Sequence, residues 1–67
     1  MSPQVRMAND IAVQFRHQAP DAAAAAIADH IRAFWDPRMR AELMRRVESE
    51  PEALDPLALA ATRLLTG

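Results

Sequence analysis

Residues 31–40 read Ile31-Arg32-Ala33-Phe34-Trp35-Asp36-Pro37-Arg38-Met39-Arg40, and they predict the main corner of the fold. An aspartate side chain can cap a helix, and proline fits the first helical position, where a missing N–H costs nothing. The residue before a proline is disfavoured in the helical conformation. One helix is therefore expected to end near Trp35 and the next to begin at Pro37, with a tight corner between them.

The same corner is a candidate surface for docking a partner, because it combines aromatic and charged side chains. It holds the single tryptophan of the chain and one of its two phenylalanines. Two adjacent aromatic residues cannot both point into a core that is one helix wide. One is therefore expected inside, and the other either half-buried at the corner or in contact with a partner, since tryptophan and arginine are enriched at interface hot spots. The candidate partner-interface residues are Phe34, Trp35, Asp36, Arg38, Met39 and Arg40.

The spacing of apolar residues predicts an all-α fold, a small bundle of three main helices plus a shorter C-terminal helix. The expected helices cover residues 4–18, 21–35 and 37–48, and the last opens at Asp55-Pro56, which repeats the pattern of Asp36-Pro37. No stretch alternates as a strand would. Residues 1–67 are expected to form a single domain, with residues 1–3 loose and Gly67 as a C-terminal stop. Ser49 and Glu52 have capping-box spacing, so residues 48–52 are either one helical turn or an acidic loop.

Four buried stripes follow from helical spacing. They comprise Val5, Ala8, Ile11, Ala12 and Phe15; Ile27, Ile31, Phe34 and Trp35; Met39, Leu43 and Val47; and Leu57, Ala60, Ala61, Leu64 and Leu65. Outside these stripes, Arg38 and Glu42 have the i, i+4 spacing of an ion pair on the third helix.

A chain of 67 residues is short for an independent core. A domain of this size buries only about 60% of its unfolded surface, and small domains commonly gain stability from disulfides, metals or a partner. The absence of cysteine excludes disulfides, thiolate zinc sites and iron–sulfur ligation by this chain. A partner surface is the natural supplement, provided by another protein or by a second copy, so the isolated chain is expected to be marginally stable or a homodimer.

Composition argues against several other classes of function. A net charge of −1 gives no electrostatic case for nucleic acid or an anionic membrane. His17 and His30 are too few to form a metal site, and no cysteine, lysine or tyrosine is present as a nucleophile. No targeting segment is recognisable, and the longest apolar run, residues 22–28, is far below the ~18 residues that span a bilayer. The chain is therefore expected to be soluble, cytoplasmic and without a metal, cofactor or catalytic residue of its own.

The central residues also resemble a known family. Phe34-Trp35-Asp36-Pro37-Arg38-Met39-Arg40, preceded by Ile27-Ala28-Asp29-His30-Ile31-Arg32, is similar to the delta subunit of soluble NAD-dependent formate dehydrogenases. Val5-Arg6-Met7-Ala8-Asn9-Asp10-Ile11-Ala12 is similar to the opening helix of that family, although Asp10 stands where the family more often has an amide. Leu54-Asp55-Pro56-Leu57 with Leu64-Leu65 is similar to its closing helix.

This resemblance implies a non-catalytic subunit of a cytoplasmic formate dehydrogenase complex. Its partners would be the catalytic and diaphorase subunits, and its role would be to support assembly or stability. The resemblance places the molybdenum or tungsten pterin, the iron–sulfur clusters and the FMN of electron transfer to NAD in those partner subunits. An alternative is a self-associating helical assembly factor that binds the immature enzyme transiently; co-purification in a fixed ratio with the active complex would distinguish the two.

Overall fold

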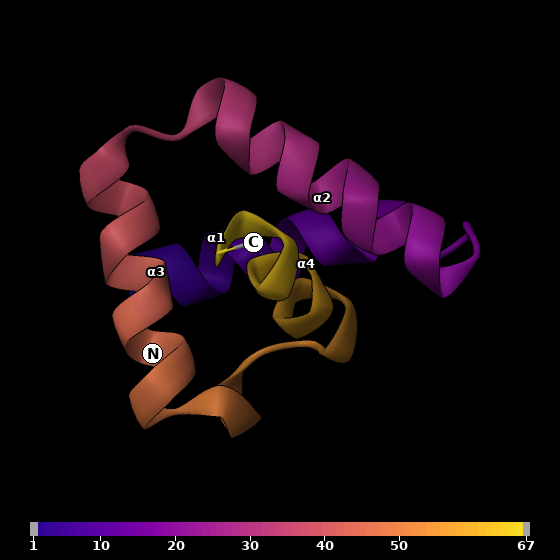
Figure 1. The fold of residues 1–67 in the computed structure, drawn as a ribbon. Helices are drawn as coiled ribbons and strands as arrows, with labels where there is room; N and C mark the ends of the chain where they lie inside the picture. The colour runs from indigo at the N-terminus through magenta and orange to yellow at the C-terminus, as the bar shows by residue number, and fades with distance from the viewer. Residues whose placement is uncertain (1, 67) are drawn as a thin grey trace.

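Four α-helices and one short 3-10 helix make up the computed structural model, which describes residues 2–66 (Figure 1). They are α1 (Pro3–Phe15), α2 (Pro20–Phe34), α3 (Pro37–Ser49), the 3-10 helix η1 (Pro51–Ala53) and α4 (Pro56–Thr66). No strand occurs within this range, so the predicted all-α fold is confirmed. Each of the five prolines of the chain occupies the first position of a helical segment, where its fixed φ favours the helix and its missing N–H is not needed.

The predicted corner is confirmed, whereas the loose N-terminus is wrong for Ser2 and Pro3. Pro3 begins α1, and Ser2 is buried and caps the helix, because its Oγ accepts the Val5 N–H at 3.2 Å. A serine before a proline is a helix-start pattern in its own right. Met1 lies outside the described residues, as does Gly67 with its predicted role as a stop.

The other boundaries differ from the predicted ones by a few residues. Helix α1 ends at Phe15 rather than near Gln18, and α2 begins at Pro20 without a side-chain cap, with Asp21 in its first turn. Residues 51–53 form a helical turn, but not through a capping box, since the Ser49 hydroxyl donates back to the Arg45 carbonyl oxygen at 3.2 Å.

The helices pack around one continuous core. Helix α2 packs against α1 and α4, and α3 closes the side of the bundle against α1 and α4 (Figure 1). Half of the buried apolar residues in the described chain are alanines: Ala8, Ala12, Ala23, Ala24, Ala28, Ala58 and Ala61. Alanine lets helices approach closely but removes little apolar surface from water, so the core is small even for this chain length.

Two predicted stripes are partly wrong. Helix α4 is turned so that Ala58, Ala61 and Thr62 are buried, while Leu64 is 44% exposed. Thr62 can occupy the core because its hydroxyl donates to the Leu59 carbonyl oxygen at 2.6 Å, which satisfies its polar group. Phe34 was predicted in the buried stripe of the second helix but is 75% exposed, because it lies in the last turn of α2, where the chain turns away into the corner.

No helix within residues 2–66 combines the length and apolar character that crossing a membrane requires.

Candidate partner-docking site

The corner between α2 and α3 is held from inside by Trp35. This residue follows the last turn of α2 in an extended conformation, and its N–H donates to the Ile31 carbonyl oxygen at 2.9 Å. Its side chain is 6% exposed and belongs to the core. Of the two adjacent aromatic residues, Trp35 is therefore the one inside, as the predicted division required, and it presents little surface to a partner.

Phe34 takes the opposite position and projects from the protein. It has the largest exposed fraction, 75%, among the large apolar side chains of the described residues. Its ring contacts the His30 ring one turn earlier in α2, with 4.8 Å between the ring centroids and 39° between the planes. This tilted aromatic contact favours one orientation of Phe34 while leaving most of its ring in solvent.

Asp36 and Met39 complete the turn into α3. The Asp36 carboxylate accepts the Met39 N–H at 2.9 Å and caps the helix as predicted. Met39 is half-buried against the core, beside an open groove between the start of α1 and the first half of α3. The groove is lined by Gln4, Asp36, Arg38, Met39, Ala41, Glu42 and Arg45.

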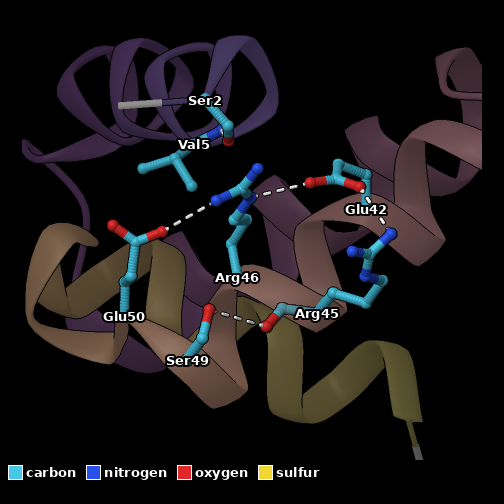
Figure 2. Close-up of polar contacts among 7 residues, drawn as sticks. All are labelled: Ser2, Val5, Glu42, Arg45, Arg46, Ser49 and Glu50. Atoms are coloured by element: carbon cyan, nitrogen blue, oxygen red, sulfur yellow. Dashed lines mark hydrogen bonds and ion pairs between the residues drawn. The ribbon is translucent and has the colours of Figure 1, made fainter.

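The charged residues of α3 divide into an unpaired set and a paired set, and Figure 2 shows the paired set with Glu50, the residue that follows the helix. Glu42 accepts hydrogen bonds from Arg45 at 3.2 Å and from Arg46 at 2.7 Å, and Arg46 also donates to Glu50 at 3.0 Å. In Figure 2 the Arg46 guanidinium lies between the two glutamates and points toward the start of α1, near Ser2 and Val5. The expected Arg38–Glu42 pair does not form, because Glu42 turns toward the C-terminal end of α3 instead.

These pairs shift the acid–base equilibria of their members. The hydrogen bond from Arg46 lowers the pKa of Glu42 below its ordinary value, outweighing partial desolvation, and the charges of Arg45 and Arg46 act in the same direction. The hydrogen bonds to Glu42 and Glu50 raise the pKa of Arg46.

Both Arg38 and Arg40, by contrast, form no ion pair or side-chain hydrogen bond with any side chain of residues 2–65.

A second polar cluster lies at the other Asp-Pro junction and was not predicted. The Asn9 side chain in α1 donates to the Ala53 carbonyl oxygen at 3.0 Å and accepts the Asp55 N–H at 2.8 Å. The Asp55 carboxylate accepts the Leu57 N–H through one oxygen and the Arg16 guanidinium through the other, both at 2.9 Å. The only signal in the sequence was the repeated Asp-Pro pattern, which marks the start of α4 but says nothing of α1.

This second cluster ties the first helix to the last. Partial burial acts to raise the pKa of Asp55, but the hydrogen bonds from Arg16 and from the Leu57 N–H outweigh it, so the pKa is lowered. No buried side-chain polar atom of the cluster lacks a hydrogen-bond partner, and its geometry is that of a structural clamp. In the part of the chain that the structure describes, no three histidine, aspartate or glutamate side chains gather as metal ligands could.

Comparison with known proteins identifies one family. The family model for the NADH-dependent formate dehydrogenase delta subunit, FdsD, matches residues 4–62, which is most of the 67-residue chain. The match includes the corner and the candidate docking residues. No curated protein and no solved structure matches the chain significantly.

Proposed function

The chain belongs to the NADH-dependent formate dehydrogenase delta subunit family, and on this basis we propose that it is a non-catalytic subunit that binds the larger subunits of the enzyme. The observation that carries the proposal is the match over residues 4–62, which begins in α1 and ends in α4. The similarity therefore extends over the whole helical domain and not over one local motif.

The construction of the core supports a dependence on a partner. Half of its buried apolar side chains are alanine, and the chain has no cysteine for a disulfide. A partner that binds the folded chain and not the unfolded one stabilises it by mass action. By the same linkage, the folded subunit stabilises the bound form of its partner, which is how a subunit without catalytic residues supports assembly.

In this proposal the chemistry belongs to the partner subunits. The molybdenum or tungsten pterin, the iron–sulfur clusters and the FMN reside in the catalytic and diaphorase subunits, in the cytoplasm. The polar side chains of this chain contribute caps, inter-helix contacts and binding surface. The residues that could meet a partner at the corner are Phe34, Asp36, Arg38, Met39 and Arg40, with Trp35 supporting them from beneath.

Co-expression of the full chain with an affinity-tagged catalytic subunit tests the proposal. We expect the chain to co-purify in a constant ratio with enzyme that carries its full cofactor content and reduces NAD with formate. Omission of the chain should lower the yield of intact complex more than the activity per assembled complex. A chain found only on enzyme that lacks its cofactors, and absent from active enzyme, would instead establish a transient assembly factor.

A further inference from the structure

The exposed apolar residues of the bundle are not equivalent. Met7, Val13 and Leu64 are 40%, 52% and 44% exposed, so about half of each side chain is shielded from solvent. Phe34 is 75% exposed, and an aromatic ring so far in water is an unfavourable placement for a side chain that could bury a large apolar area. Its position at the end of α2 makes it the most accessible apolar side chain of the corner.

Two positive charges without internal partners accompany this ring. Arg38 and Arg40 lie in the first turns of α3, directly after the corner. The two nearest carboxylates are already engaged: Asp36 caps α3, and Glu42 binds Arg45 and Arg46. Arg38 is exposed and lines the groove beside Met39, whereas Arg40, two positions further along the helix, is half-buried and lies on another side. The corner thus offers an apolar anchor, Phe34, and an exposed guanidinium group, Arg38, that has no ion pair or side-chain hydrogen bond within residues 2–65.

The corner is also ordered by internal contacts within the chain itself. Trp35 is anchored in the core, the Asp36 cap fixes the first turn of α3, and the His30 ring supports Phe34 from one side. A surface that is already ordered loses less conformational entropy on association, so more of its contact energy appears as affinity.

We propose that Phe34 inserts into an apolar pocket on a larger subunit of the formate dehydrogenase, and that a carboxylate at the rim of this pocket pairs with Arg38. This inference rests on the proposed function, because it assigns the partner and the face that meets it. A second copy of the chain is a poorer occupant. A two-fold contact centred on the corner would bring two copies of the unpaired Arg38 into one interface, while the neighbouring carboxylates Asp36 and Glu42 are already engaged within each copy, so the added positive charge would disfavour it.

The predicted insertion of Phe34 into an apolar pocket is tested with Phe34→Ala, and Val13→Ala is the matched control. Both substitutions remove an exposed apolar side chain from a helix, so both should leave the helical content of the chain unchanged. Purified chain is titrated into enzyme assembled without it, and the dissociation constant is measured. Phe34→Ala should weaken binding at least about tenfold, whereas Val13→Ala should change it by less than about twofold.

The predicted ion pair between Arg38 and the partner is tested with Arg38→Glu. This substitution should weaken docking without destabilising the folded chain. At the start of α3 a glutamate interacts favourably with the helix dipole, so the melting temperature of the free chain should stay the same or rise. Binding to the enzyme should nonetheless weaken at least about fivefold and depend less steeply on salt concentration. Arg6→Glu, on an exposed arginine of α1 without an ion pair in the described chain, is the control and should bind as the unmodified chain does.

The outcomes separate this inference from the proposed function. If the unmodified chain binds the enzyme while Phe34→Ala and Arg38→Glu bind equally well, the corner is not the interface, and the subunit assignment stands. If the unmodified chain does not bind the enzyme, both fail. If Phe34→Ala abolishes self-association of the free chain without weakening binding to the enzyme, a second copy covers the corner and the inference is overturned.

Discussion

The Trp35-Asp36-Pro37 corner and the Leu54-Asp55-Pro56 junction share one local geometry. Trp35 has φ −93° and ψ 140°, and Leu54 has φ −94° and ψ 140°; both are 6% exposed. Each precedes an aspartate whose carboxylate accepts a backbone N–H of the helix that follows. An apolar residue that turns inward, a capping carboxylate and a proline therefore produce the same turn twice in this chain.

What surrounds the two aspartates differs. Asp55 has two contacts with the first helix and its end: its carboxylate accepts the guanidinium of Arg16, the residue that follows α1, and its N–H donates to Asn9 within α1. The Asp36 side chain bonds only to the N–H of Met39 among the described residues. A local motif thus specifies where a helix begins, and the helix that packs beside it determines whether the junction becomes a clamp or stays open to a partner.

The largest effect is expected within the corner itself, from substitution of its two adjacent aromatic residues. Trp35→Ala removes the largest side chain of the core and should lower the free energy of unfolding by about 3–5 kcal/mol. Phe34→Ala removes an exposed ring and should change it by less than about 0.5 kcal/mol. Urea denaturation followed by circular dichroism measures both. Equal losses would show that Phe34, too, is packed in solution.

The next largest loss of stability is expected from the clamp formed by Asn9 and Asp55. Asn9→Ala leaves the Ala53 carbonyl and the Asp55 N–H, both partly buried, without their partner, and should cost about 2 kcal/mol. Asp10→Ala, at the exposed neighbouring position, is the control and should cost less than about 0.5 kcal/mol. Amide hydrogen exchange should also show the N–H of Asp55 losing protection in Asn9→Ala alone. An unchanged melting temperature in Asn9→Ala would mean that α1 and the junction are held together by apolar packing only.

A smaller difference in stability is expected between substitutions of the two capping aspartates, Asp36 and Asp55. Asp36→Ala removes one capping hydrogen bond and should cost about 1 kcal/mol. Asp55→Ala removes a cap together with an ion pair to the largely exposed Arg16, and should cost about 1.5 kcal/mol. If the corner docks the enzyme, Asp36→Ala should also weaken binding more than its loss of stability explains, and Asp55→Ala should not. If Asp36→Ala and Asp55→Ala lose binding in proportion to their loss of stability, the proposed role of Asp36 in docking is contradicted.

The sequence alone was enough to predict the four helices and to place the starts of α3 and α4, which an aspartate and a proline mark locally. The starts of α1 and α2 were each predicted one residue late, because α2 has no capping side chain and the Ser2-Pro3 pattern was not used. The sequence was also enough to predict that one of the two corner aromatics packs inside. It could not assign Phe34 to solvent, since helical spacing puts Phe34 on the same stripe as Ile27 and Ile31, and only the end of the helix removes it from the core.

Polar contacts between distant residues were beyond local patterns. Asn9 and Asp55 lie 46 positions apart, and the sequence around either residue gives no indication of their hydrogen bond. The rotation of α4 was missed for a related reason: Thr62 looks like a surface residue until its hydroxyl is satisfied by the Leu59 carbonyl oxygen in the same helix. The candidate docking residues were chosen from their chemistry, and the structure adds which of them are accessible and which are unpaired.

The smallest effect is a pH dependence that belongs to the clamp. The pKa of Asp55 is lower in the folded chain than its ordinary value of 3.8, so the folded state binds fewer protons than the unfolded state as the pH falls toward that value. The stabilisation is therefore fully present above that ordinary value and is lost as the pH falls through the folded pKa. Asp55→Asn keeps a capping side chain but removes the charge that Arg16 meets.

We expect Asp55→Asn to be less stable than the unmodified chain by under about 1 kcal/mol near neutral pH, and the two to converge as the pH falls through the folded pKa of Asp55. Glu42, whose pKa is also lowered, adds acid sensitivity of the same sign to both proteins, so Asp55→Asn should still lose stability in acid, only less. Urea unfolding across this range measures the difference at each pH. If the difference in stability between the two proteins stays constant with pH, the substitution acts through altered capping. The Arg16–Asp55 ion pair would then not contribute to the difference between the two junctions.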